Sequence, residues 1–144
     1  MSNIYSQIIL DHCNNPRNYG ALYKCDKNTT RRNRICGDEL SVFAKFETEQ
    51  ETQVISAVSF MCNGCAITQA SASIITEHIK NMPISEALDF VENFPEWIES
   101  NPECIHKDEF QALREIRTVP ARLNCALLPF VAIQDLLKDS NGHA

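Results

Sequence analysis

The chain has 144 residues, of which 44% are hydrophobic and 22% are charged, and its formal net charge is −6. A chain of this size can bury one hydrophobic core, so we expect a single domain over residues 1–144. The acidic balance argues against nucleic acid as a partner, because nucleic-acid-binding domains concentrate Lys and Arg on one surface. The one basic cluster, Arg31-Arg32-Asn33-Arg34, indicates a solvated loop more strongly than a docking patch.

The N-terminus and the cysteine content indicate a cytoplasmic protein. Residues 1–10 lack the basic start and the long apolar stretch of a signal peptide. No segment reaches the roughly 20 apolar residues of a membrane span, so we expect no membrane partner. Seven cysteines in a reducing compartment stay free, and an odd number cannot pair completely. Metal binding or thiol chemistry is therefore favoured over a disulfide framework.

The first predicted element is a short amphipathic helix. Ser2 can serve as its N-cap, and isoleucines recur behind it at helical spacing. Asn15-Pro16 should end this helix, because the residue before a proline avoids the α region. The mostly polar run that follows, up to Arg34, allows one exposed strand.

Two stretches with period-two alternation then predict an antiparallel hairpin. The first covers residues 39–46 and the second covers residues 54–61, with a polar turn over residues 47–52 between them. The start of the first strand and the end of the second lie at the same end of such a hairpin. Cys36 should therefore lie near Cys62 and Cys65.

Helices are predicted for the rest of the chain. A helix that begins at Cys65 presents small residues for tight packing on the sheet, and a second helix should be capped by Ser85 and broken by Pro95. A third should span residues 108–116 with Phe110 and Leu113 turned inward.

The last predicted helix starts at Pro120 and carries an apolar stripe that includes Cys125. Pro129 should kink it, because a proline lacks the N–H that would bond the carbonyl of residue 125. Residues from Asp139 onward should fray. The order of elements predicts an α+β fold: a small antiparallel sheet of about three strands, helices packed on one side, an N-terminal helix, and a C-terminal helix carrying Cys125.

Cys36, Asp38, Cys65 and Cys125 are candidate metal ligands. Three thiolates and one carboxylate suit tetrahedral Zn²⁺, and the same residues could hold an iron–sulfur cluster with one ligand that is not a thiolate. Glycines at positions 37 and 64 would let the backbone bend toward one point. The alternative is that Cys36 and Cys125 are small buried hydrophobic residues, as free cysteines often are.

A dithiol oxidoreductase is a second possibility, because Cys62 and Cys65 have two residues between them and lie between a predicted strand and a helix. Against it, the neighbouring strands indicate an antiparallel hairpin, whereas a thioredoxin-type sheet needs a βαβ unit. The histidines of the chain have no paired nucleophile in sequence. We therefore expect core or surface positions, and no catalytic role, for His12, His78 and His106.

Several motifs occur in a characteristic order. They are Tyr5-x-x-x-Ile9-x-Asp11-His12-x-x-Asn15-Pro16-Arg17-Asn18-x-Gly20, Cys36-Gly37-Asp38, Gly64-Cys65-Ala66-Ile67 with Ala70-Ser71-Ala72-Ser73, and Ala121-Arg122-x-x-Cys125-Ala126-x-Leu128. Together they resemble the iron–sulfur cluster assembly scaffolds of the IscU/NifU/SufU family, over about residues 5–137. Asn124 stands where the IscU branch has a histidine, and this difference favours the SufU branch.

The resemblance implies a function in iron–sulfur cluster biogenesis. The protein would accept sulfane sulfur from a pyridoxal-phosphate-dependent, SufS-like cysteine desulfurase and serve downstream iron–sulfur acceptor proteins. It also implies that Cys36, Asp38, Cys65 and Cys125 are the ligands, with Cys36 as the sulfur acceptor because it lies on a loop. Our first hypothesis is a zinc-dependent sulfur acceptor, and the alternative is a scaffold that binds iron or a transient [2Fe–2S] cluster. Cys62 replaces a usual glycine of the family, which leaves open whether it is a ligand too.

Overall fold

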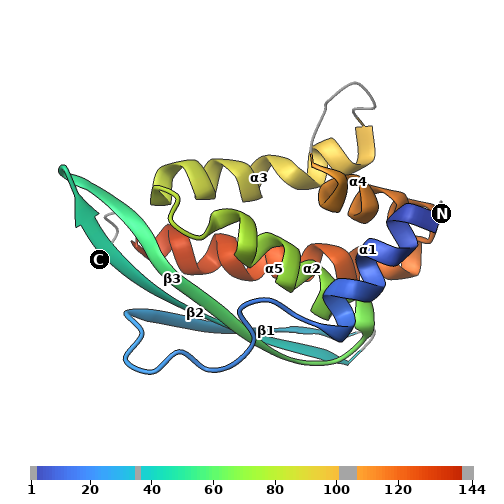
Figure 1. Cartoon of the computed structure of the whole chain (residues 1–144), viewed down its shortest axis with the longest axis horizontal. Helices are drawn as coiled ribbons and strands as arrows, with labels where there is room; N and C mark the ends of the chain where they lie inside the picture. The colour runs from blue at the N-terminus through green and yellow to red at the C-terminus, as the bar shows by residue number, and fades with distance from the viewer. Residues whose placement is uncertain (1–2, 35–36, 101–106, 141–144) are drawn as a thin grey trace.

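The α+β order expected from the sequence is confirmed. The computed structural model describes residues 3–34, 37–100 and 107–140 (Figure 1). Along the chain lie α1 (Asn3–Asn14), β1 (Lys27–Asn33), β2 (Asp38–Glu49), β3 (Thr52–Asn63), α2 (Ala66–Ile79), α3 (Ile84–Ser100), α4 (Asp108–Glu115), the short 3₁₀ helix η1 (Ile116–Thr118) and α5 (Pro120–Ser140). The proposed N-cap Ser2, and Cys36 and His106, lie outside the described residues.

The three strands form one antiparallel sheet in the order β1-β2-β3. Strands β2 and β3 are the predicted hairpin, but its turn is shorter than predicted. Glu49 pairs with Thr52, so only Gln50 and Glu51 form the turn. Both have positive φ values, 48° and 68°, which matches the twist that a two-residue hairpin turn requires.

Strand β1 is the exposed strand that the polar run allowed. The basic cluster that we predicted to lie in a loop begins in this strand, because Arg31 and Arg32 pair with residues of β2. Arg31 forms an ion pair with Asp135 at 2.8 Å, and Arg32 forms one with Glu39 at 2.6 Å.

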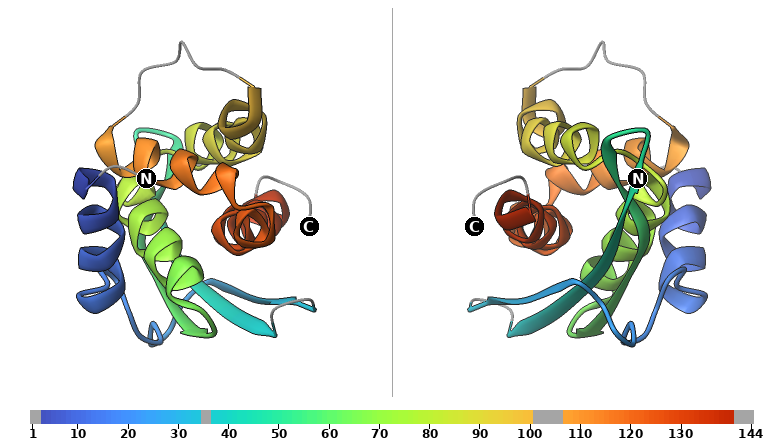
Figure 2. Two further views of the ribbon diagram at one scale, coloured as in Figure 1. Left: turned by 90° about the vertical axis from the view of Figure 1, so that its right-hand side faces the viewer. Right: turned by 90° about the vertical axis from the view of Figure 1, so that its left-hand side faces the viewer.

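The helices gather on one face of the sheet, as the two side views in Figure 2 show. Helices α2 and α5 pack on the strands, α3 packs on α5, and α1 and α4 lie beside α2. The inward residues of β2 alternate as predicted, with Leu40, Val42 and Ala44 all buried. Within the described ranges, no helix is both long enough and apolar enough to cross a membrane.

Two predictions about α3 are wrong. Ser85 is not its N-cap, because the helix already begins at Ile84. Pro95 does not end it, and the helix continues to Ser100 with Trp97 and Ile98 buried. Burying a large apolar side chain contributes about 1.5–3 kcal/mol. A few such side chains therefore offset the roughly 3 kcal/mol that a proline costs inside a helix.

Helix α5 begins at Pro120 as predicted, and its stripe is buried: Cys125, Leu128, Ala132 and Leu136. Pro129 lies inside the helix, which runs on to Ser140, so fraying is wrong for Asp139 and Ser140. The rest of that prediction, for residues 141–144, lies outside the described residues. The kink beside Cys125 stays a prediction. Phe130 of this helix stacks on Phe94 of α3 with ring centroids 4.1 Å apart, which holds the outer helix on α5.

Candidate metal centre

Three of the four predicted ligands meet at one end of the sheet. Asp38 begins β2, Cys65 directly precedes α2, and Cys125 lies in α5. One ligand atom from each residue lies within 4.8 Å of those of the other two. The strand register explains part of this convergence, because Glu39 pairs with Asn63 and the chain leaving β3 passes Asp38. The placement of Cys36 at this centre stays a prediction.

Asp38 accepts hydrogen bonds through both of its carboxylate oxygens. Its Oδ1 accepts the backbone N–H of Cys65 at 2.8 Å, and its Oδ2 accepts the hydroxyl of Thr68 at 2.8 Å. Burial raises the pKa of Asp38, but hydrogen bonds from Thr68, the Cys65 backbone and the thiols of Cys125 and Cys65 outweigh it, so that the pKa lies below its ordinary value. The group is therefore an anionic carboxylate at neutral pH.

Gly64 permits the close approach of Asp38 to the start of α2. A Cβ atom at position 64 would lie 2.7 Å from Cγ and 2.9 Å from Cβ of Asp38. Both distances are well below van der Waals contact. Gly37, on the other side of Asp38, has φ +74° and lies in the left-handed region that favours glycine. Glycine is thus required at position 64 by the nearby Asp38 side chain and is favoured at position 37 by the backbone conformation.

The residues present fit a zinc ion. Two sulfur ligands of a tetrahedral Zn²⁺ with Zn–S bonds near 2.3 Å lie roughly 3.8 Å apart. The observed separations, up to 4.8 Å, need only a small contraction to reach this value. Asp38 is buried and anionic, and a buried charge is stabilised by a positive charge beside it. A cation between these side chains would supply it.

Cys62 is not part of this group of three. It lies opposite Leu40 in the sheet and is half-buried against the hydrophobic core. Burial raises the pKa of Cys62 to about 12, with Asp38 and Cys65 adding to the shift. The thiol is thus protonated at neutral pH in the protein without a metal, which makes it a poor nucleophile. The three strands form an antiparallel sheet, whereas a thioredoxin-type dithiol oxidoreductase needs a βαβ unit. The fold therefore argues against this alternative.

Thr68 was not among the site residues predicted from the sequence. It is fully buried, donates to Asp38, and lies 3.5 Å from Sγ of Cys65. The available signal was its position three residues after Cys65, since residues three apart at a helix start lie on the same side.

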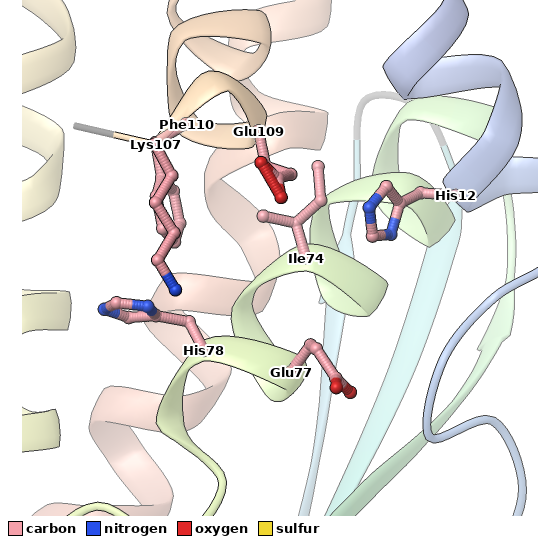
Figure 3. A pocket seen from close by; sticks show the side chains of 7 residues that line it. All are labelled: His12, Ile74, Glu77, His78, Lys107, Glu109 and Phe110. Atoms are coloured by element: carbon pink, nitrogen blue, oxygen red, sulfur yellow. The ribbon is translucent and has the colours of Figure 1, made fainter.

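A second cluster of polar side chains surrounds a small pocket of about 50 Å³ between α1, α2 and α4. Figure 3 shows the residues that line it: His12, Ile74, Glu77, His78, Lys107, Glu109 and Phe110. His12 is buried, as expected for a core histidine, and its Nδ1 lies 2.8 Å from Oγ of Ser73. The same Oγ accepts the backbone N–H of Arg17. His12 therefore fixes α1 to α2.

We expect His12 to make the fold sensitive to acid. Burial lowers the pKa of His12 below its ordinary value of 6.5. The unfolded chain therefore binds more protons below pH 6.5, and stability falls as the pH decreases from there toward the folded-state pKa. The slope contributed by this one group is at most about 1.4 kcal/mol per pH unit. His12→Asn should remove this contribution in urea unfolding measured between about pH 7 and about pH 5. A variant with the same pH dependence as the parent would contradict the assignment.

Comparisons with known proteins show the family to which the chain belongs. The NifU-like N-terminal domain family matches residues 4–117. The zinc-dependent sulfurtransferase SufU of Bacillus subtilis is 30% identical over 149 residues, covering 99% of this chain and 96% of that protein. The iron–sulfur cluster assembly scaffold protein IscU of Streptococcus pyogenes is 28% identical over 142 residues, covering 97% of this chain and 86% of that protein.

Solved structures show the same fold over nearly the whole chain. The crystal structure of a hypothetical protein, 26% identical, superposes with a TM-score of 0.83 and covers 96% of this chain and 99% of its own. A candidate iron–sulfur cluster assembly scaffold for the SUF system from Fervidobacterium islandicum is also 26% identical. Its structure superposes with a TM-score of 0.75, and the match covers 95% of this chain and 99% of that chain. The chain therefore belongs to the NifU-like N-terminal domain family, together with SufU and IscU proteins of iron–sulfur cluster assembly.

Proposed function

We propose that this protein is a zinc-dependent sulfur acceptor of the SufU kind that serves iron–sulfur cluster biogenesis. The observation that carries the proposal is the convergence of Asp38, Cys65 and Cys125 at one point. The name of the Bacillus subtilis relative, a zinc-dependent sulfurtransferase, supports it. Asn124, in place of the histidine of the IscU branch, supports the SufU assignment as well.

In this proposal Zn²⁺ is held by Asp38, Cys65, Cys125 and, as the fourth ligand, Cys36. A bound zinc ion lowers the pKa of its thiol ligands and contributes folding free energy. The described ligands come from β2, from the residue before α2, and from α5. Loss of the metal should therefore loosen the contact between the sheet and two helices at this end of the molecule.

The sulfur donor in the proposal is a pyridoxal-phosphate-dependent, SufS-like cysteine desulfurase that carries a persulfide. The thiolate of Cys36 attacks the outer sulfur of that persulfide. The S–S bond breaks, the desulfurase cysteine leaves as a thiolate, and Cys36 becomes the persulfide, so that no external oxidant or reductant is needed. The sulfur then passes to downstream iron–sulfur acceptor proteins. The free thiol that this step requires persists in a reducing compartment such as the cytoplasm.

The metal content of the protein, purified without added metal, tests the proposal. We expect one zinc per chain and no visible absorption. Brown protein that contains iron and sulfide would instead indicate the alternative, a scaffold carrying a [2Fe–2S] cluster on the same ligands. Metal-free protein with disulfide-exchange activity dependent on Cys62 and Cys65 would contradict both and favour the oxidoreductase.

A further inference from the structure

We infer that Thr68 is a positioning residue of the proposed metal centre, where its hydroxyl orients the Asp38 carboxylate and ties it to the helix that carries Cys125. The inference rests on the proposed zinc site. Thr68 is not itself a proposed ligand, but its hydroxyl oxygen contacts all three of the described ligand residues.

The contacts of one oxygen atom carry the argument. Oγ1 of Thr68 lies 2.8 Å from Oδ2 of Asp38, 3.2 Å from the carbonyl oxygen of Cys125 and 3.5 Å from Sγ of Cys65. Thr68 is fully buried, so water does not compete for this hydroxyl. A hydroxyl whose neighbours all belong to ligand residues is well placed to control how they face one another.

The carbonyl of Cys125 lies at a point where α5 departs from the regular helical pattern. In a regular helix it would accept the N–H of the residue four positions later. That residue is Pro129, inside α5, which has no N–H to donate. The Thr68 hydroxyl lies where it can donate to this carbonyl, and one turn along α2 the hydroxyl of Ser71 donates to the carbonyl of Ala126 at 2.6 Å. Helix α2 therefore binds the backbone of α5 beside the ligand cysteine.

The single hydroxyl hydrogen of Thr68 is directed mainly at Asp38. The carboxylate is the closer acceptor, and a charged acceptor forms the stronger bond. The other carboxylate oxygen accepts the N–H of Cys65. Asp38 is thus held through both oxygens. A further contact, from Sγ of Cys65 to Oδ2 at 3.5 Å, would be lost when a metal deprotonates that thiol, which leaves a lone pair for the metal. A carboxylate that loses such outer hydrogen bonds typically loses 10–100-fold in metal affinity.

The experiment compares Thr68→Val, which keeps the shape and removes the hydroxyl, with Thr68→Ser, which keeps the hydroxyl. Zinc affinity is measured by competition with a chromogenic chelator, and Co²⁺ substitution reports the ligand geometry through its visible spectrum. We expect Thr68→Val to bind zinc about 10–100-fold more weakly with an altered Co²⁺ spectrum, and Thr68→Ser to stay close to the parent.

Thr76→Val is the matched control. Thr76 is also fully buried in α2, and its hydroxyl donates to the carbonyl of Ala72 at 2.7 Å. The same substitution there should lower stability without changing zinc affinity, which separates positioning from general packing. If Thr68→Val does not fold, Thr68→Ala compared with Thr68→Ser provides the same contrast, since the two differ in the hydroxyl.

Unchanged zinc affinity and an unchanged Co²⁺ spectrum in Thr68→Val would overturn the inference and leave the proposed function intact. A parent protein that binds no zinc would overturn both. An equal loss of affinity in Thr76→Val would also overturn the inference, because it would assign the effect to the packing of α2.

Discussion

Cys65→Ser is expected to lose its metal and much of its stability, whereas Cys62→Ser should keep nearly stoichiometric metal. The two cysteines lie three positions apart, yet only Cys65 lies within 4.8 Å of the ligand atoms of Asp38 and Cys125. Structural zinc contributes folding free energy directly, with apparent values of about 10–16 kcal/mol in small zinc-binding peptides. A variant that cannot hold the ion forfeits this contribution, while Cys62→Ser should show only a modest packing loss at a half-buried site.

The two variants are compared side by side under reducing conditions, with metal content and melting temperature as the readouts. Equal loss of metal from both would make Cys62 a ligand and displace Asp38 from the proposed set. Equal loss of disulfide-exchange activity, in a parent protein without metal, would instead favour the oxidoreductase. The two cysteines therefore discriminate between the metal and redox functions with one pair of substitutions.

The hairpin was predictable because its information is local. Alternation along residues 39–46 matches the buried inner face of β2, where Leu40 and Val42 lie. The end of β3 and the beginning of α2 were marked by the change of pattern around Cys65. Once two such strands pair in antiparallel register, the proximity of Asp38 to Cys65 follows from topology alone.

The errors concern positions where distant packing overrides a local preference. Pro95 would end an isolated helix, but Phe94 beside it stacks on Phe130, a residue 36 positions further along the chain. No local rule reports such a contact. The hairpin turn was predicted too long for a related reason: polar residues 47–49 look like a turn, yet they pair with residues of β3 at an exposed end of the sheet.

The candidate site was predictable only in part. Asp38, Cys65 and Cys125 are ligand types at motif positions, so the family resemblance could name them from the sequence. Thr68 could not be named, because its contact with the Cys125 carbonyl joins residues 57 positions apart. Pro129 was recognised as a residue that removes a helical hydrogen bond, but the sequence does not say that the Thr68 hydroxyl lies beside the affected carbonyl.

Cys36→Ser is expected to abolish stimulation of a SufS-like cysteine desulfurase and to leave the fold largely intact. In the proposed function Cys36 is the thiolate that attacks the persulfide. A serine hydroxyl cannot replace it, because its much higher pKa leaves it protonated and weakly nucleophilic. Gly37 alone separates this residue from Asp38 in the chain, so the acceptor is tethered next to the proposed centre. The core packs around β2, β3 and the helices, and Asp38, Cys65 and Cys125 remain to hold a metal in this variant. The fold should therefore depend less on Cys36 than on Cys65.

The measurement is desulfurase turnover with and without each variant, alongside circular dichroism to confirm the fold. Cys25→Ser is the matched control. Cys25 is a free, half-buried cysteine that precedes β1 at Lys27, while Asn33 at the other end of this strand pairs with Asp38. Seven strand residues at about 3.3 Å each place Cys25 roughly 20 Å from the site, so its loss should leave stimulation unchanged. Full stimulation by the Cys36 variant would move the acceptor role to another cysteine, and Cys65, at the open start of α2, would be the next to test.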